Sequence, residues 1–205
     1  MRSIRTLIVP VVLLAALAAC GSDGGGSGDG ASERSSASSA TRPTDATVPE
    51  GAVTATIRTD LGDIVVALDT ANAPKASARF VELAQSGFYD GLTFHRAVPD
   101  FVIQGGDPKG DGTGGTDRSV QGEVPDRYRI GSVAAAKTGS DPPGTFDCQF
   151  FIVTGPAGER LPPEYASFGT VTSGLDVAQR IEALAPARGD GPPTRKVTIE
   201  SVTIS

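Results

Sequence analysis

Two neighbouring stretches near residue 60 have the periodicity of strands. Residues 53–59 and 64–69 each place apolar side chains at every second position, and Asp60-Leu61-Gly62-Asp63 separates the two stretches. A period of two is typical of strands with one buried face, and a short polar link that contains glycine is typical of a tight turn. The pattern therefore predicts a β-hairpin.

Two stretches have the spacing of helices. Asn72-Ala73-Pro74 offers an N-cap and a proline for the first turn, and apolar residues then recur at helical spacing until Gly87. Ser173, with Asp176 three residues later, is expected to open a second helix that Pro186 ends. The chain therefore has two predicted helices.

The remaining apolar runs are short, rich in β-branched and aromatic residues, and separated by Gly and Pro loops. They lie at residues 93–97, 101–104, 131–136, 149–154, 167–170 and 194–204. Many short strands with turn residues between them predict an antiparallel barrel or a sandwich. We expect a barrel, because open edges on such a sheet invite aggregation. The predicted fold class is mainly β, a closed eight-stranded antiparallel β-barrel with two capping α-helices.

The first twenty residues do not follow this pattern of short apolar runs. Two arginines precede an apolar run at residues 7–19, and Cys20 follows. This order describes a secretory signal peptide, and thirteen apolar residues are too few to span a bilayer. Leu17-Ala18-Ala19-Cys20 resembles the bacterial lipobox, which implies cleavage before Cys20 and lipid on its thiol. We predict a signal peptide at residues 1–19 and lipidation of Cys20; a plain secreted protein is the alternative.

Residues 21–50 are mainly Gly, Ser, Thr and Ala. Such a stretch buries too little apolar surface to offset its ordering entropy, so residues 20–50 are predicted to be a lipidated cysteine plus a disordered tether. Its expected reach is about 30 Å. The predicted domain then occupies residues 51–205. We expect an exported protein, anchored through lipid to the outer face of a bacterial cell membrane.

Charge and composition narrow the chemistry. The chain has 205 residues, 18 Lys and Arg against 24 Asp and Glu, and a net charge of −6. The scattered acidic excess argues against nucleic-acid binding, which needs a clustered basic face. One histidine, His95, is too few for a multi-histidine metal site, and the chain has no Gly-x-Ser-x-Gly elbow. No metal, cofactor or nucleic acid is predicted.

Three other features have ordinary interpretations. Residues 110–115 lack the Lys-Ser/Thr of a phosphate loop and are expected to form a surface loop with positive φ angles. Pairings such as Asp107 with Asp111, or Asp100 with Glu123, are expected by chance among 24 acids and are interpreted as solvated surface. If lipid occupies Cys20, Cys148 has no disulfide partner, and we expect it to be buried in the barrel.

Three blocks in order carry a resemblance to a known family. Residues 94–107, FHRAVPDFVIQGGD, resemble the FHR-x-x-x-x-F-x-x-QGGD motif of the cyclophilins, which are peptidyl-prolyl isomerases. Residues 148–152, CQFFI, match their S-QFFI strand, and residues 161–169, LPPEYASFG, are similar to the bacterial LPPxYxxFG loop. The spacing agrees over residues 53–204. The resemblance implies an isomerase with proline-containing polypeptides as partners, and we expect a monomer.

The chemistry of such a site can be reasoned from the reaction. Rotation about a prolyl amide has a barrier of about 18–20 kcal/mol, since the nitrogen lone pair is delocalised. A catalyst needs no nucleophile, but it needs a dry slot for the proline ring and a fixed donor that favours the twisted state. Phe101, Val102, Phe151 and Leu161 could line the slot. In the family the donor is the arginine of FHR, here Arg96, and a guanidinium does not titrate.

The resemblance implies further roles for individual positions. Gln104 would bond the peptide backbone and orient Arg96, and His95 would be a structural neighbour of Arg96. The implied catalytic residues are Arg96, Phe101 and Gln104. The implied substrate-binding residues are Val102, Gly112, Thr113, Ala135, Ala136, Phe151, Leu161 and Tyr165.

The chain departs from the family pattern at three places. Ala135 replaces the asparagine of many relatives, and Leu161 replaces a tryptophan, which implies weak cyclosporin binding. Phe146-Asp147-Cys148 replaces a run of small residues and is expected to narrow or reshape the subsite beside the proline slot. The leading hypothesis is an isomerase that speeds folding of exported proteins. The second hypothesis is a module that binds proline-containing segments as a chaperone or scaffold without turnover.

Overall fold

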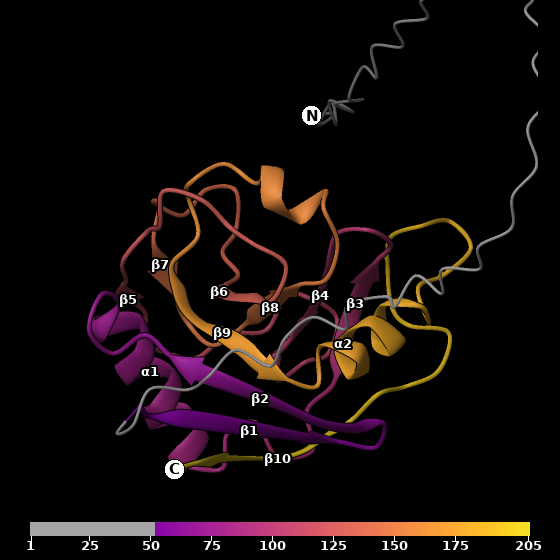
Figure 1. Ribbon diagram of the computed structural model, residues 1–205, viewed down its shortest axis with the longest axis horizontal. Coiled ribbons are helices and arrows are strands. Elements are labelled where there is room, and N and C mark those ends of the chain that lie inside the picture. The colour runs from indigo at the N-terminus through magenta and orange to yellow at the C-terminus, as the bar shows by residue number, and fades with distance from the viewer. Residues whose placement is uncertain (1–51) are drawn as a thin grey trace, which may run out of the picture. The chain divides into compact units, whose positions relative to one another are not determined.

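A computed structural model describes residues 52–205, which form a large antiparallel sheet with two α-helices (Figure 1). The predicted signal peptide at 1–19, the lipidation site Cys20 and the predicted tether at 20–50 lie outside the described residues. Within 52–205, neither helix has the length and apolar character needed to cross a bilayer.

The predicted hairpin is present as β1 (Thr54–Thr59) and β2 (Gly62–Leu68), which pair in antiparallel register. Gly62 has a φ of +129°, a backbone conformation that residues with a Cβ rarely adopt. The hydroxyl of Thr59 donates to the carbonyl of Gly62 at 2.7 Å and closes the turn. The apolar pattern of the two strands and the turn residues between them therefore both favour this hairpin.

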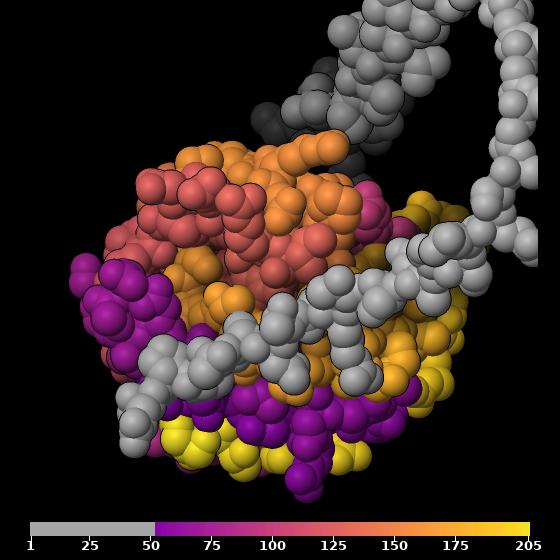
Figure 2. All heavy atoms as spheres, viewed as in Figure 1, coloured from indigo at the N-terminus to yellow at the C-terminus, as the bar shows by residue number. Residues whose placement is uncertain are grey.

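The other predicted strands are also present, with shifted ends. They are β3 (Phe94–Val98), β4 (Val102–Gly105), β6 (Ser132–Ala135), β8 (Phe150–Val153), β9 (Ser167–Ser173) and β10 (Ile199–Ile204). With β1 and β2 they form one sheet in the order β10-β1-β2-β9-β6-β8-β4-β3. In Figure 2 the indigo β1–β2 hairpin accordingly lies between the yellow C-terminal strand and an orange segment. A small separate sheet of β5 (Val120–Gln121) and β7 (Thr145–Phe146) was not predicted.

The prediction of a closed barrel is wrong, because the sheet is an open half-barrel. Its edge strands β10 and β3 do not pair along their length; an isolated bridge between Thr93 and Thr198, outside both strands, joins their ends. The last strand begins at Ile199 rather than at Thr194. The preceding loop instead covers the edge of β3, where the amide of Ala97 donates to Gly191 at 2.8 Å. Covering an edge prevents aggregation as closure does, so the edge argument did not require a closed barrel.

Helix α1 (Pro74–Gln85) begins where the sequence places it, with Pro74 in the first turn, but its cap differs from the prediction. Asn72 does not cap the helix, since its side chain binds Asp69. The amides of Lys75 and Ala76 instead donate to the carboxylate of Glu123, at 3.3 Å each. A carboxylate at a helix N-terminus accepts the free amides and complements the helix dipole.

Helix α2 (Leu175–Glu182) is shorter than predicted. Ser173 ends strand β9, and Gly174, with a φ of +79°, takes the N-cap position. A side chain at Gly174 would lie 2.1 Å from the carbonyl oxygen of Asp63, so this junction needs glycine. The helix then ends at Glu182, four residues before Pro186.

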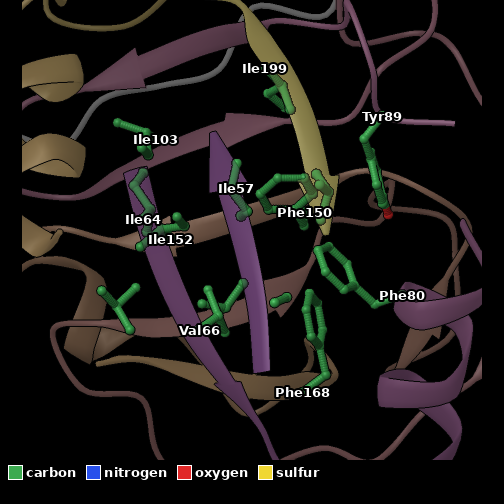
Figure 3. Close-up of a cluster of buried hydrophobic side chains, with 14 of the residues drawn as sticks. Ile57, Ile64, Val66, Phe80, Tyr89, Ile103, Phe150, Ile152, Phe168 and Ile199 are labelled. Carbon is green, nitrogen blue, oxygen red and sulfur yellow. The ribbon is translucent and has the colours of Figure 1, made fainter. Parts of the chain in front are cut away.

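The main hydrophobic core lies between the concave side of the sheet and α1. Aromatic rings gather beside α1, where Phe80 stacks on Phe168 and Tyr89 at centroid distances of 4.8 and 5.1 Å (Figure 3). Cys148 is fully buried in this cluster, as predicted.

A second, smaller cluster lies on the outer face of β4, β6 and β8. Its buried members are Val102, Tyr128, Ala134, Phe151 and Val153. Alternate residues of these three strands point to the main core and to this cluster, so the strands are buried on both faces. The outer cluster supports the candidate site.

Candidate active site

Strand register brings the first three site residues together. Arg96 on β3 pairs with Gln104 on β4, and Gln104 pairs with Phe151 on β8. Side chains directly opposite on neighbouring strands lie close together on one face of a sheet. The sheet therefore sets the spacing of a cation, an amide and an aromatic ring.

These residues border a hollow of about 180 Å³. It is lined by Arg96, Phe101, Val102, Gln104, Ala136, Lys137, Phe151, Leu161 and Tyr165. Sites for drug-sized ligands have volumes of about 300–1,000 Å³, so this hollow suits a single ring or side chain. The structure thus brings together eight of the eleven residues predicted for the domain's site.

Arg96 is held at the rim by two partners. Its Nε and Nη2 donate to the carboxylate of Asp190 at 2.7 and 2.8 Å, and its Nη1 donates to Oε1 of Gln104 at 3.3 Å. The hydrogen bond to Asp190 is the main reason that the pKa of Arg96 is raised. The same contact lowers the pKa of Asp190. Both groups are therefore charged near neutral pH.

Gln104 continues this network away from Arg96. Its Nε2 donates to Oε1 of Gln149 at 2.9 Å, and Nε2 of Gln149 donates to the carbonyls of Gly112 and Gly114 at 3.2 and 2.8 Å. Because Gln149 has a fixed donor side, its oxygen must face Gln104, and the oxygen of Gln104 must face Arg96. The network therefore sets the orientation of the Gln104 amide.

The wall opposite Arg96 is aromatic. The rings of Phe151 and Tyr165 meet edge to face at 5.4 Å. The hydroxyl of Tyr128 donates to the carbonyl of Tyr165 at 2.8 Å and accepts from its amide at 2.9 Å. These bonds hold the backbone of Tyr165, so the wall has a defined position.

Lys137 is a lining residue that sequence reasoning missed. Its side chain is only 4% exposed, its Nζ lies 3.3 Å from a carboxylate oxygen of Glu164, and it sits 5.4 Å from the ring centroid of Tyr165. A lysine directly after the apolar strand at 131–136 was the available signal. The hollow thus has a second cation, which Glu164 neutralises.

A smaller hollow of about 100 Å³ adjoins the first and shares Gln104, Ala136 and Lys137 with it. Asp147 lines this second hollow, whereas its neighbours Phe146 and Cys148 are fully buried in the main core. The departure at 146–148 therefore contributes a carboxylate to the second hollow and puts no aromatic ring into it.

The structure places Gly112, Thr113 and Ala135 outside the lining of both hollows. Ala135 is fully buried in the main core, and its amide donates to Ala166 at 2.8 Å. Gly112 and Thr113 lie in an exposed loop, and a contact of these residues with a bound peptide stays a prediction.

That exposed loop is organised by Asp107, which the sequence analysis interpreted as solvated surface. This interpretation is wrong, since Asp107 is 1% exposed. Its carboxylate accepts bonds from the amides of Lys109, Asp111 and Gly112. Gly110 and Gly112 have the predicted positive φ angles. Hydrogen bonds to the Asp107 carboxylate therefore hold the backbone of this loop, which has no regular secondary structure.

His95 is buried beside Arg96 but lines a different hollow. Burial lowers the pKa of its imidazole, so the ring is neutral at pH 7. Neither ring nitrogen has a hydrogen-bond partner within residues 52–205.

Within residues 52–205, no three His, Cys, Asp or Glu side chains are grouped as a metal site would require.

Comparisons with known proteins all point to one family. The family model for cyclophilin-type peptidyl-prolyl cis-trans isomerases (Cyclophilin type peptidyl-prolyl cis-trans isomerase/CLD) matches residues 54–204. Peptidyl-prolyl cis-trans isomerase ppi1 of Schizosaccharomyces pombe is 40% identical over 144 residues, which cover 66% of this chain and 89% of the relative. Peptidyl-prolyl cis-trans isomerase A of Mycobacterium tuberculosis is 37% identical over 174 residues, or 77% of this chain and 94% of the relative.

Solved structures show the same fold. A cyclophilin-type isomerase of Cryptosporidium parvum superimposes with a TM-score of 0.68 and 31% identity, and the match covers 74% of this chain and 96% of that chain. The segments 94–107, 148–152 and 161–169 of this chain all contribute residues to the hollow at Arg96. The chain therefore belongs to the cyclophilin family and is a cyclophilin-type peptidyl-prolyl cis-trans isomerase.

Proposed function

We propose that Arg96 drives isomerisation by donating a hydrogen bond to the prolyl nitrogen while the proline ring sits in the adjoining hollow. One observation carries this proposal: a fixed guanidinium borders a hollow that has an aromatic wall and room for one ring. In the planar amide the nitrogen lone pair is delocalised, whereas in the twisted state it is localised and accepts a hydrogen bond. The donor therefore favours the twisted state over the ground state.

The magnitude is within reach of this geometry. A thousandfold to millionfold acceleration requires about 4–8 kcal/mol of differential stabilisation. A preorganised donor in a site from which water is excluded contributes about 2.7–4 kcal/mol. The apolar walls of Phe101 and Phe151 displace water from the amide, and Gln104 aligns the peptide backbone. Desolvation and alignment supply the remainder.

Substitution of Arg96 by lysine tests the mechanism, because lysine keeps the charge but loses the fork. A single ammonium nitrogen cannot make the two parallel bonds to Asp190 while a second nitrogen faces Gln104 and the prolyl nitrogen. In a protease-coupled assay on an Ala-Pro peptide, Arg96→Lys is expected to lower kcat/KM by about tenfold or more. The matched control is Arg58→Lys, since Arg58 is exposed on β1 and, among residues 52–205, pairs only with Asp63. Full activity of Arg96→Lys would refute the role.

The substrate proposal is that the hollow takes proline residues of exported polypeptides near the membrane. Its support is the signal-like sequence at residues 1–19, the lipobox-like segment ending at Cys20 and the Gly/Ser-rich tether that follows. In bacteria expressing the full chain, labelled palmitate is expected to attach to the wild type and not to Cys20→Ala. Equal labelling of both would leave a secreted protein without this anchor.

The same purified protein tests the function in folding. Added to a secreted protein whose refolding is limited by proline isomerisation, it is expected to speed the slow phase, and Arg96→Lys is not. Size-exclusion chromatography is expected to show a monomer. The scaffold alternative predicts binding of proline peptides with no rate above background in either assay. The motive for that alternative is the departure at residues 146–148, of which Asp147 lines the second hollow while Phe146 and Cys148 are buried.

A further inference from the structure

Asp190 makes the shortest contacts of the Arg96 guanidinium. Both carboxylate oxygens accept hydrogen bonds, from Nε at 2.7 Å and from Nη2 at 2.8 Å. Two parallel bonds of this kind fix the plane of a guanidinium as well as its position. The two residues are 94 positions apart in the chain, and no sequence motif points to Asp190.

The loop between α2 and β10 is shaped to present this carboxylate. Gly189 and Gly191 flank Asp190 with φ angles of +89° and +147°. A Cβ on Gly191 would lie 2.5 Å from the guanidinium of Arg188, whose Nε donates to the carbonyl of Asp190 at 2.9 Å.

The loop is also tied to the strand that carries the arginine. The amide of Ala97, next to Arg96, donates to Gly191 at 2.8 Å, so the loop runs beside β3 (Figure 1). This backbone hydrogen bond joins the residue after Arg96 to the residue after Asp190. This arrangement holds the carboxylate at the guanidinium independently of the ion pair itself.

We propose that Asp190 is a positioning residue for isomerisation, which holds the Arg96 guanidinium in the plane that turns Nη1 toward the hollow. This inference rests on the role proposed above for Arg96. A guanidinium has five N–H donors. Asp190 occupies the edge formed by Nε and Nη2, and Gln104 accepts one bond from Nη1. The second N–H of Nη1 stays available for the prolyl nitrogen.

Without Asp190, the long arginine side chain regains rotamers that point away from the hollow. The arginine side chain is 34% exposed, so solvent offers its donors competing partners. Turnover would then require the productive rotamer to be selected at each event, which lowers kcat. Asp190 does not line the hollow, so its loss removes no direct contact with a bound peptide, and KM is expected to change little.

The experiment compares Asp190→Ala and Asp190→Asn with the wild type in the protease-coupled Ala-Pro assay. The expected result for Asp190→Ala is a kcat about tenfold lower with a KM within about twofold, which corresponds to 1.4 kcal/mol in the barrier. Asp190→Asn keeps one acceptor oxygen and is expected to fall between the two. Glu200→Ala is the charge control, because Glu200 is exposed and its carboxylate has no bonded partner within the described residues. It is expected to match the wild type.

A spectroscopic readout separates positioning from stability. The Arg96 Nε–H signal in a ¹⁵N–¹H spectrum is expected to be sharp and protected in the wild type, and to exchange with water in Asp190→Ala. Urea unfolding of each variant measures the folded fraction. A fall in kcat that exceeds the loss of folded protein, together with loss of the Nε–H signal, supports the inference.

Two results would overturn it. An unchanged or higher kcat in Asp190→Ala would show that the ion pair does not position Arg96 for turnover. A fall in kcat that only matches the loss of folded protein would show a structural role. If Arg96→Lys is inactive while Asp190→Ala is fully active, only this inference fails. If Arg96→Lys is as active as the wild type, the proposed mechanism itself fails.

Discussion

Arg79 is a buried cation that links helix α1 to two segments near the second hollow. Its side chain is 4% exposed. Its Nε donates to the carbonyl of Asp147 at 2.9 Å, and its Nη2 donates to Thr116 and to the carbonyl of Arg118 at 2.8 and 2.9 Å. Glu82, one turn along the helix, lies 3.3 Å from Nη1. Loss of the guanidinium leaves all four partners without this donor.

The change Arg79→Met keeps an unbranched apolar stem and removes the guanidinium with its charge and its donors. Three hydrogen bonds from a charged donor are lost, and buried acceptors such as the carbonyl of Asp147 are left unsatisfied. Glu82 is 47% exposed and stays hydrated, so the loss comes from the three hydrogen bonds, at about 1–1.5 kcal/mol each or about 3–5 kcal/mol together. We expect the free energy of unfolding to fall by this amount, out of about 5–15 kcal/mol for a typical domain. The melting temperature should fall by about 6–20 °C.

Urea unfolding followed by circular dichroism measures this change. The matched control is Arg58→Met, because Arg58 is 61% exposed and pairs with Asp63 at 3.5 Å. An exposed pair contributes about 0–1 kcal/mol, so the control should stay within about 1 kcal/mol of the wild type. If Arg79→Met and Arg58→Met are equally stable, the guanidinium of Arg79 does not hold these segments together, and the reasoning is refuted.

Two further predictions concern groups outside the hollows. Burial is the main cause that raises the pKa of the Cys148 thiol to about 12. In a Cys20→Ala background we expect no reaction of native protein with a thiol reagent at pH 8, and rapid reaction in urea. Because the native thiol binds its proton more tightly than the unfolded thiol, Cys148 should lower the free energy of unfolding as the pH rises above about 9. A Cys148→Ala variant whose free energy of unfolding falls equally above this pH would contradict the prediction. Glu123→Ala should cost about 1 kcal/mol by uncapping α1, whereas Asn72→Ala should cost less than about 0.5 kcal/mol; the reverse order in urea unfolding would contradict the assigned cap.

Local patterns predicted much of the fold because its elements depend on neighbouring residues. The β1–β2 hairpin follows from alternation and from Gly62, and α1 from apolar spacing after Pro74. Arg96, Gln104 and Phe151 were identified from motifs in separate strands, and pairing of those strands brings them together. For such elements, side-chain period and turn chemistry carry enough information.

Long-range contacts account for what was missed. The cap of α1 comes from Glu123, nearly fifty residues away, and nothing in the local sequence distinguishes that acid from the others. The open sheet has a similar origin, since it depends on where β10 begins and on a loop that covers β3. Asp107 was misinterpreted because a buried carboxylate that binds loop amides has no periodic pattern.

The position of the arginine shows why both kinds of information are needed. Strand register fixes the Cα of Arg96 opposite Gln104, but a register cannot set the four side-chain torsions that separate the Cα from the guanidinium. Those torsions are set by side-chain contacts, through Asp190 on one edge and through Gln104, whose amide Gln149 orients, on the other. Asp190 and Gln149 both belong to segments that are distant from β3 and β4 in the chain. A motif can therefore place an arginine on the correct strand, while the orientation of its guanidinium depends on tertiary partners that the motif does not contain.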